Sequence, residues 1–348
     1  MEAPLYAFHG MVAPERERLR DETETVELSI VVPVYGCRDC LRALHERIRR
    51  SVEPLTSSFE LVLVDDRSPD GAWDTICALA HEDPAVRGVR LSRNFGQHAA
   101  ITAGLAQSRG TWTVVMDCDL QEPPEAIPRL YATAREGYDI VYTARARDRG
   151  LRAVAARAYV SLRNFFLETN VKSEHGMLSI LSRKVVDAFL RLRDRDREYR
   201  IMLGWLGFRH ATIEVERAPR HHGRSSYTLR RLLRVAFDGV FFQTTVLLRW
   251  IVLLGFVVAF AGILLAVYDV VAYLRDQSPS GYTSLAVLIL VLGGLILTSM
   301  GVIGLYVGRI FEQVKERPLY VIDDEVEGRG EVRTVGDPFE GVAARREP

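Results

Sequence analysis

The sequence predicts an α/β domain with a mostly parallel sheet, followed by an amphipathic helix at a membrane surface and two transmembrane helices. Three observations support this fold class. Short apolar runs rich in β-branched residues alternate with helical patterns through about the first two thirds of the chain. Acidic and polar residues follow several of these runs. Two long apolar segments lie near the end of the 348-residue chain, which has room for one large domain plus such appendages.

Five apolar runs have the length and composition of buried strands. They cover residues 28–34, 59–64, 86–91, 111–116 and 139–142. Helical patterns fill intervals between them, at residues 40–50, 72–81 and 97–107. This alternation is typical of a largely parallel sheet with helices on both faces. Neither G-x-G-x-x-G after the first strand nor G-x-x-x-x-G-K-[ST] is present, which excludes nucleotide binding through those glycine-rich loops.

Residues 111–125, TWTVVMDCDLQEPPE, carry the strongest chemical signal. The apolar half is a strand that delivers Asp117 and Asp119 to its carboxyl end, where an open α/β sheet binds ligands. Because side chains alternate along a strand, the two carboxylates share one side. Such a pair suits one hard divalent cation that bridges to phosphate, so the motif indicates a Mg²⁺ or Mn²⁺ site for a nucleotide diphosphate. Taken alone, the pair is explained more simply as an acidic turn.

Two uncharged apolar segments predict a membrane hairpin. Residues 250–268 form a run of about 19 residues, roughly 28 Å as a helix, and residues 282–308 a run of about 27, each long enough to cross a bilayer. Basic residues flank the outer ends of the pair, and the connection carries only Arg275. The flanking residues are Arg230, Arg231, Arg234, Arg249, Arg309, Lys315 and Arg317. By the positive-inside rule, both ends of the hairpin are cytoplasmic.

Residues 229–245 predict an amphipathic helix that lies in the headgroup plane, because apolar residues recur at helical spacing and arginines occupy the rest of the wheel. The alternative is a helix packed on the globular domain. The polar, glycine-rich stretch from about Glu325 onward predicts a disordered tail. Residues 1–25 carry many charges and no apolar run, so they predict a loosely ordered arm and not a signal peptide.

Composition and cysteine content bear on the class of binding partner and on the redox compartment. The formal net charge is zero, so no global field favours a nucleic-acid partner. The four cysteines, Cys37, Cys40, Cys77 and Cys118, give neither a disulfide framework nor a zinc pattern. Cys37-x-x-Cys40 has the spacing of a redox pair, but a pair of ordinary thiols in the first turn and helix is the favoured interpretation. A reducing compartment fits this cysteine content best.

Ordered motifs in the first half of the chain resemble those of family 2 glycosyltransferases of the GT-A fold. They are IVVPVY at 30–35, VDDRSPDG at 64–71, RNFG at 93–96 and MDCDLQEPPE at 116–125. Together with the two apolar segments, their order resembles the polyprenyl-phosphate branch: bactoprenol glucosyl transferases, dolichol-phosphate-mannose synthases and undecaprenyl-phosphate aminoarabinose transferases. RKVVDA at 183–188, WLGF at 205–208 and R-x-x-G-x-S-x-Y at 220–227 match this branch as well. The resemblance covers the chain from about Ser29 to Ile322.

The resemblance implies a division of the chain and a set of roles. Residues 26–228 would be the catalytic domain, 229–245 the interfacial helix, 246–310 the transmembrane region and 311–348 a cytoplasmic tail. In the nucleotide-sugar site, Pro33 and Tyr35 would border the base, Asp65 would accept from it, and Asp66 or Ser68 would lie near it. Asp117 would face the ribose or sugar, Asp119 would hold the metal and Gln121 would lie beside the sugar. The residues expected to hold an acceptor phosphate are Arg145, Arg200, Arg220, Ser225 and Tyr227, with Arg163 a weaker candidate.

The chain departs from the branch in the acceptor half. Relatives usually carry Gly-Asp-Phe-Arg-Leu where this chain has Met177 in place of the aspartate and Ser179 in place of the arginine. Ser226 replaces a lysine that is usual in the branch. The expected function is transfer of a sugar, with inversion, from a UDP-sugar or less favourably a GDP-sugar to undecaprenyl phosphate for surface-glycan modification. The site would be cytoplasmic, in a multi-pass protein of the inner (plasma) membrane. The departures keep a different acceptor, such as a lipid-linked glycan, open.

Two further functions fit the sequence less well. A processive polysaccharide synthase would carry Gln-x-x-Arg-Trp, whereas Gln243 and Arg249 are too far apart here. A non-catalytic sugar-binding or scaffold protein is disfavoured by the complete acidic motifs. Small residues at Gly301, Gly304 and Gly308 would suit a helix-packing face, either for homo-oligomerisation or between the two spans of one chain.

Overall fold

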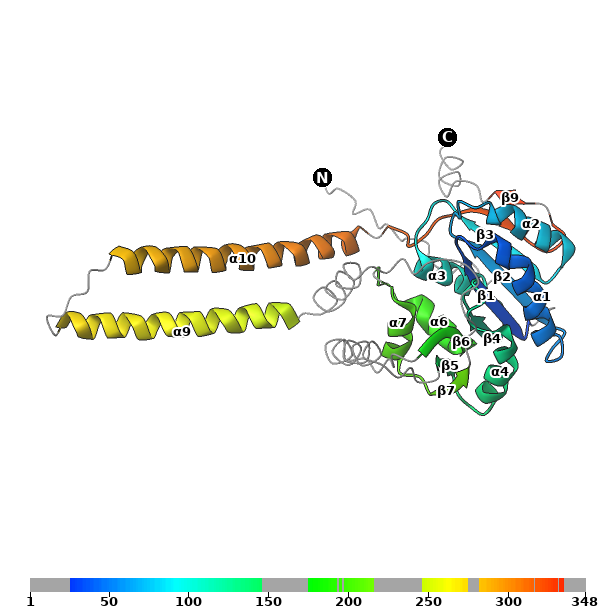
Figure 1. The fold of residues 1–348 in the computed structure, drawn as a ribbon, viewed down its shortest axis with the longest axis horizontal. Coiled ribbons are helices and arrows are strands. Elements are labelled where there is room, and N and C mark those ends of the chain that lie inside the picture. Colours follow the sequence, from blue (N-terminus) through cyan, green and yellow to red (C-terminus); the bar gives the residue numbers. More distant parts are fainter. Residues whose placement is uncertain are drawn as a thin grey trace, which may run out of the picture.

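Nine strands form one sheet at the centre of the domain (Figure 1). The computed structural model describes residues 26–145, 175–192, 194–195, 197–215, 246–274, 282–315, 317–330 and 332–334. The strands are β1 (Leu28–Val34), β2 (Phe59–Asp65), β3 (Val86–Leu91), β4 (Trp112–Val115), β5 (Ile140–Arg145), β6 (His175–Ser182), β7 (His210–Val215), β8 (Ile322–Val326) and β9 (Arg333–Thr334). Their order across the sheet is β7-β5-β6-β4-β1-β2-β3-β8-β9.

The sheet is mixed, which corrects the expectation of a mostly parallel one. Strands β4, β1, β2 and β3 are parallel neighbours, as the alternation predicts. Strand β6 runs antiparallel to both β4 and β5, and β8 runs antiparallel to β3. The five predicted strands include neither β6 nor β8, and side-chain periodicity marks where a strand lies without giving its direction.

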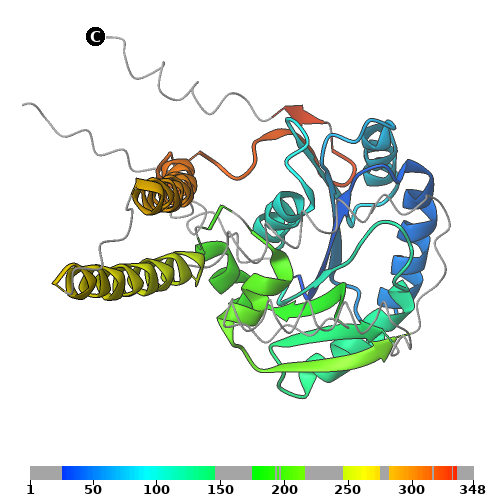
Figure 2. The ribbon, with the colours of Figure 1, turned by 60° about the vertical axis from the view of Figure 1, so that its left-hand side comes forward.

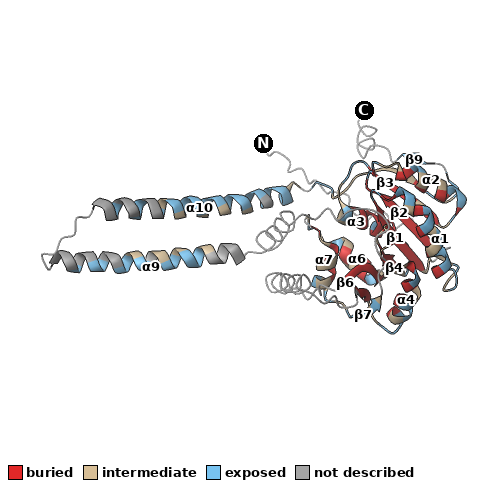
Figure 3. Ribbon diagram, in the orientation of Figure 1, coloured by how far each residue is buried: buried red, intermediate tan, exposed pale blue. Residues whose placement is uncertain are grey.

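Helices cover both faces of the sheet and give it two cores. They are α1 (Leu41–Val52), α2 (Ala72–Glu82), α3 (Gln97–Gln107), α4 (Ile127–Arg135), α6 (Arg183–Arg191) and α7 (Tyr199–Leu206). In β1, Ile30 and Val32 face a core shared with α1, α2 and α4, while Val31 faces a second core shared with α3, α6 and α7. Every residue of β1 is buried, and all of them except Ser29 near its start are apolar (Figure 3).

Two long helices extend from the domain as an antiparallel pair. Helix α9 (Val246–Leu274) runs away from the sheet and α10 (Tyr282–Val314) returns to it (Figure 1). Within the described residues, one segment is long and apolar enough to cross a membrane, Leu292–Val314, with a mean hydropathy of 1.6. The corresponding apolar part of α9 is shorter, Ile251–Leu264, so one of the two expected spans meets this criterion. A Cβ added at Gly301, Gly304 or Gly308 would meet no atom within 4 Å, so these glycines do not pack against α9.

Several sequence predictions fall on residues that the structure does not describe. They are the N-terminal arm at 1–25, the amphipathic helix at 229–245, and the acceptor candidates Arg163, Arg220, Ser225 and Tyr227. Ser226 also lies outside the described residues.

The segment after α10 rejoins the sheet, and this corrects the expectation of disorder from about Glu325. Strand β8 pairs with β3 and β9 pairs with β8, with Glu325 opposite Val89 and Arg333 (Figure 2). Composition alone suggested disorder because the segment is polar and glycine-rich. Its charges are matched instead by arginines of the domain: Arg67 pairs with Asp323, Arg90 with Asp324, and Arg87 and Arg109 with Glu327.

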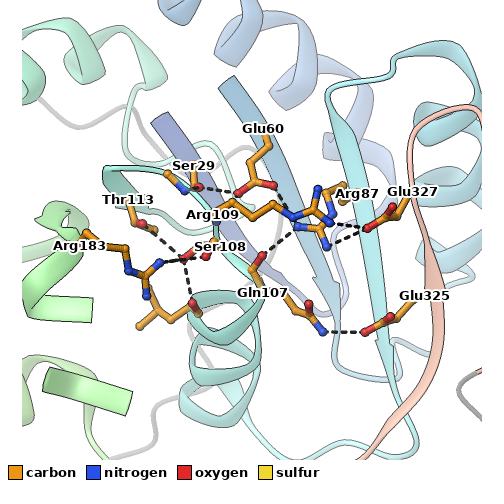
Figure 4. A network of polar contacts seen from close by, with 12 residues as sticks. Ser29, Glu60, Arg87, Gln107, Ser108, Arg109, Thr113, Arg183, Glu325 and Glu327 are labelled. Carbon is orange, nitrogen blue, oxygen red and sulfur yellow. Dashed lines mark hydrogen bonds and ion pairs between the residues drawn. The ribbon is translucent and has the colours of Figure 1, made fainter. Parts of the chain in front are cut away.

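A polar network holds this returning segment at the amino-terminal edge of the parallel strands (Figure 4). Buried Glu60 accepts from the Ser29 hydroxyl at 2.6 Å and pairs with Arg87 at 3.0 Å. Arg87 also reaches Glu327 at 3.1 Å, and Gln107 donates to Glu325 at 2.6 Å. Because Glu60 is buried, its charge is stable there only with these partners. The network therefore connects the strand starts of β1, β2 and β3 to the end of the chain.

Replacing Val326 by Ala should destabilise the catalytic domain. Val326 is 3% exposed and belongs to the core that contains Trp73 and Ile76. Truncation leaves a cavity, so we expect the free energy of unfolding to fall by about 1–3 kcal/mol. The measurement is denaturant unfolding of the detergent-solubilised protein followed by tryptophan fluorescence. Val332→Ala, at a 47%-exposed position of the same segment, is the control and should leave the midpoint unchanged. Equal midpoints for both variants would show that the segment is not part of the folded domain.

Candidate functional site

The candidate site lies where the strand order reverses. The chain proceeds from β1 outward through β2 and β3, and then crosses back to place β4 on the other side of β1. All four strands are parallel, so their carboxyl ends share one edge of the sheet. In open α/β sheets this reversal leaves room for a ligand outside the strand ends. Tyr35, Asp65 and Asp117 come from the ends of β1, β2 and β4, so the structure brings the predicted donor-binding residues together.

Hydrogen bonds from its own turn fix the position of Asp65. This carboxylate is fully buried, and its Oδ1 accepts from the backbone N–H of Ser68 at 2.9 Å. Its Oδ2 makes no hydrogen bond to any described residue and lies 3.5 Å from Nε of Arg90. Burial raises the pKa of Asp65, while the Ser68 N–H and Arg90 act in the opposite direction. Asp65 therefore keeps acceptor capacity that a ligand donor can use.

Both carboxylate oxygens of Asp66 already accept hydrogen bonds from the protein itself. Its two oxygens accept from the backbone N–H groups of Phe95 and Gly96 at 2.7 and 2.8 Å. Burial raises its pKa, and these two bonds counteract the rise. The Asp66 side chain therefore shapes the RNFG turn after β3, a role that the sequence did not reveal.

A chain of hydrogen bonds joins the turns after β1 and β2. The backbone N–H of Gly36 donates to the Ser68 hydroxyl at 2.7 Å, and that hydroxyl donates to Asp70 at 2.6 Å. Gly36 has φ +68°, which favours glycine, and it places Tyr35 at the surface with 53% exposure. Pro33 is buried within β1 opposite Val64. Tyr35 is thus the predicted base-bordering residue that is accessible to a ligand.

The two aspartates after β4 flank Cys118 in the turn that follows the strand. Met116, Cys118 and Leu120 pack into the core beneath α1 and α4, while Asp117 and Asp119 remain half-buried. Asp117 accepts from the Gln97 amide of α3 at 2.6 Å. Asp119 accepts from the backbone N–H of Gln121 at 3.1 Å, a turn assisted by Leu120 at φ +59°.

The carboxylate oxygens at this edge fit a hard divalent cation that is shared with a bound ligand. Asp117 and Asp119 offer carboxylate oxygens, the atoms that Mg²⁺ and Mn²⁺ prefer. In the described part of the chain, no cluster of three or more His, Cys, Asp or Glu is placed to hold a metal. A cation held by Asp117 and Asp119 would take its other ligands from phosphate oxygens and water. The Gln121 amide nitrogen, buried and without an acceptor among the described residues, suits a ligand oxygen.

The predicted acceptor residues are only partly described. Arg200 on α7 donates to the backbone carbonyl of His175 at 2.8 Å. His175 stacks on Tyr142, with ring centroids 4.4 Å apart. Arg145 is the last residue of β5, opposite Val215, and its side chain is outside the description. Arg200 and the end of β5 therefore lie near one another, at the start of β6.

Met177 and Ser179, the two departures from the resembling branch, are internal. Met177 is 8% exposed and Ser179 is fully buried. The Ser179 hydroxyl bonds with the hydroxyl of Tyr199 at 2.9 Å and with the Met177 carbonyl at 3.0 Å. An uncharged methionine and a hydrogen-bonded serine thus occupy the positions where an aspartate and an arginine are usual. Their substitution does not by itself remove a charge from an exposed acceptor surface.

Sequence reasoning missed three residues that shape this edge. Glu122 is buried, and its carboxylate accepts from the backbone N–H groups of Met177 and Leu178. Gln97 supports Asp117 from the first residue of α3. Cys118 forms a disulfide with Cys37, which corrects the expectation that the cysteines are unpaired thiols. The two cysteines are 81 residues apart, and no sequence pattern reveals such a contact.

Comparison with known proteins assigns the family. The family model described as glycosyl transferase family 2 matches residues 29–190. The chain is 36% identical over 310 residues to the undecaprenyl-phosphate 4-deoxy-4-formamido-L-arabinose transferase of Serratia proteamaculans, covering 86% of this chain and 94% of that one. The chain belongs to glycosyl transferase family 2. The domain is accordingly of the GT-A type, with a mixed sheet.

Further relatives share nearly the full length. The corresponding transferase of Yersinia enterocolitica is 37% identical over 317 residues, covering 88% of this chain and 95% of that one. An uncharacterized glycosyltransferase of Synechocystis is 34% identical over 304 residues, covering 86% and 96%. Among solved structures, glucosyl-3-phosphoglycerate synthase of Mycobacterium tuberculosis, crystallised with Mn²⁺, UDP and phosphoglyceric acid, is 20% identical. It covers 62% of this chain and 76% of that one, with a TM-score of 0.42.

Replacing Glu122 by Gln should weaken the link between the aspartate turn and β6. The amide nitrogen would face a backbone N–H that now donates to a carboxylate, so a buried donor loses its partner. We expect the free energy of unfolding to fall by about 1–3 kcal/mol. Glu125→Gln, in the same motif, breaks only an exposed ion pair with Arg47 and should cost less than about 1 kcal/mol. The measurement is denaturant unfolding of both variants. Equal unfolding free energies for the two variants would refute a supporting role for Glu122.

Proposed function

We propose that this glycosyltransferase moves a sugar, with inversion, from a nucleotide-diphosphate sugar, UDP-sugar favoured, to undecaprenyl phosphate at the cytoplasmic face of the membrane. The observation that carries the proposal is the gathering of Tyr35, Asp65, Asp117 and Asp119 at one sheet edge. It occurs in a chain whose relatives over nearly their full length are named as undecaprenyl-phosphate sugar transferases. The product would be a lipid-linked sugar for modification of surface glycans.

The donor half of the site would bind and orient the nucleotide sugar. Tyr35 offers an exposed ring for the base, and Asp65, whose Oδ2 faces Arg90 without a hydrogen bond, would accept from base or ribose donors. Asp117 and Asp119 would hold Mg²⁺ or Mn²⁺, which when bound offsets negative charge on the leaving diphosphate. Gln121 would donate to a sugar oxygen. These groups are held by Gln97, Ser68 and the Gln121 backbone before any ligand arrives, which favours a preorganised site.

The acceptor half would position an anion. A phosphate oxygen is already ionised at neutral pH, so attack on the anomeric carbon needs no strong general base. Arginine side chains suit phosphate because their donors match its oxygens. Arg200, with Arg145 and Arg220, is the proposed set, and Ser225 and Tyr227 would close over the phosphate. Since Met177 and Ser179 are internal and neutral, the structure gives no reason to prefer a glycan acceptor over a simple polyprenyl phosphate.

The helical hairpin supports a multi-pass membrane arrangement. Helices α9 and α10 expose many large apolar side chains, including Phe256, Phe260 and Leu297, which water disfavours. Both helices meet the domain at the same end, and β8 belongs to the same sheet as β1 (Figure 1). Arg195 of the domain pairs with Glu312 near the end of α10 at 3.8 Å. If the hairpin spans the inner membrane, the domain and both helix ends lie on one side, which the flanking arginines assign to the cytoplasm.

Asp119→Asn should abolish most of the transferase activity. Loss of one carboxylate weakens the hold on the cation and on the diphosphate, so turnover should fall at least about 100-fold. Asp74→Asn, an exposed carboxylate on α2, is the matched control and should retain activity. The measurement is release of nucleoside diphosphate by purified protein with and without a chelator. Full activity of the variant, or of wild type in chelator, would remove the metal role.

Radiolabel from a UDP-sugar should enter the organic phase when membranes containing the enzyme and undecaprenyl phosphate are partitioned. The product should be labile to mild acid, and Arg220→Ala should reduce it. Because nucleotide sugars do not cross membranes, inverted vesicles should be active with external donor and sealed right-side-out vesicles should not. Label confined to a preassembled glycan would overturn the acceptor assignment. Activity in right-side-out vesicles alone would overturn the topology.

A further inference from the structure

Cys37 and Cys118 are joined by a disulfide directly beneath the proposed donor site. Their Cα atoms are 6.4 Å apart, and each residue is 8% exposed. Cys37 follows Tyr35 and Gly36 in the turn after β1. Cys118 stands between Asp117 and Asp119 in the turn after β4. The bond therefore spans the strands at which the sheet order reverses.

The orientation of Cys118 keeps the sulfur out of the ligand space. Cys118 packs with Met116 and Leu120 in the core on the α1 side of the sheet, and Cys37 belongs to the same core. Asp117 points to the opposite side, where it meets Gln97 of α3. A bond on the core side can hold the two turns together without obstructing a nucleotide or its cation.

We propose that Cys37 and Cys118 are a reversible oxidation site whose disulfide fixes the spacing of the two turns that bind the donor. The inference rests on the proposed function for the identity of the ligand between those turns. Oxidation would hold the site in its binding geometry. Reduction would replace one covalent bond by two thiols, which need more room, so the turns carrying Tyr35 and the aspartates would relax. Rigid, preformed binding loops gain affinity because less order is lost on binding.

The oxidant we invoke is a low-molecular-weight disulfide. The thiolate of one cysteine attacks a sulfur of that disulfide, which forms a mixed disulfide and releases one small thiolate. The second cysteine thiolate then attacks the cysteine sulfur of the mixed disulfide and releases the other small thiolate. Two cysteine thiols are oxidised, one small disulfide is reduced to two thiols, and the two cysteine protons end on them. A dithiol reductant runs the sequence backward.

The location of the bond favours a regulatory role over a purely structural one. With the topology proposed above, the pair lies on the cytoplasmic side, where small thiols keep most cysteines reduced and disulfides are usually transient. Cys40 lies one helical turn from Cys37, but burial, with the carboxylates of Asp119 and Asp39, raises its pKa. Cys77 on α2 likewise has a pKa raised by burial. Cys40 and Cys77 are free thiols, so the bonded pair is Cys37 with Cys118.

The test uses full-length protein in nanodiscs, equilibrated with glutathione disulfide or with dithiothreitol. Peptide mapping by mass spectrometry after alkylation reports the bonded pair, independently of activity. We expect Cys37 bonded to Cys118 in the oxidised sample and both free in the reduced one. Donor KM should rise at least about threefold on reduction, with a smaller change in kcat. Cys118→Ser and Cys37→Ser should have the reduced-state KM under both conditions, whereas Cys77→Ser should respond like wild type.

Two outcomes overturn the proposal, and they differ from failure of the proposed function. Mapping that finds Cys37 bonded to Cys40, or both sulfurs free after oxidation, removes the site. If the Cys37–Cys118 bond forms and breaks completely while the donor KM stays the same, the disulfide has no effect on donor binding. This comparison uses the wild-type protein, so it does not depend on whether a variant folds. By contrast, a protein whose bond forms and breaks as expected but which turns over no nucleotide sugar contradicts the function and leaves the oxidation site standing.

Discussion

The parallel pairing of β1 with β2 on one side and β4 on the other is the constraint on which the rest of the structure depends. Because β1 is buried on both faces, none of its side chains can be polar except near its ends. Polar groups accumulate where the strands stop. At the amino ends they form the network around Glu60, which is structural. At the carboxyl ends, on either side of the reversal in strand order, they are the residues that we propose bind the donor.

Carboxylates at the functional edge divide into those the protein uses and those it leaves available. Both oxygens of Asp66 accept from backbone N–H groups of the neighbouring turn, and the Glu122 carboxylate accepts from backbone N–H groups of β6. Asp65 keeps one oxygen without a hydrogen bond. Burial raises the pKa of Asp65, so its ionised form costs free energy in the absence of a ligand. A buried acceptor of this kind gains from a donor on the ligand, which gives it a physical reason to discriminate among bases.

The sequence predicted those parts of the fold that depend on local periodicity. The bounds of β1, β3 and α3 agree with the apolar patterns because each segment packs on a surface that its own spacing defines. The sequence could not predict the direction of β6, the pairing of β8 with β3, or the Cys37–Cys118 bond, since each depends on which distant segment lies alongside. The polar, glycine-rich stretch from Glu325 suggested disorder because its partners Arg87, Gln107 and Arg109 are more than 200 residues away in sequence.

In the membrane arrangement that we propose, the return of the chain to the sheet after α10 connects the position of the helices to the geometry of the site. A catalytic domain attached only before α9 would hang from a single linker, and its distance from the bilayer would be set by that linker. Here β8 is an integral strand, Asp323 pairs with Arg67 in the turn that carries Asp65, and Arg195 pairs with Glu312 of α10. The domain is held at two points of the chain, which restricts its rotation relative to the helices. For an acceptor whose phosphate is confined to the headgroup layer, such restriction does part of the positioning that a soluble substrate would require from the site itself.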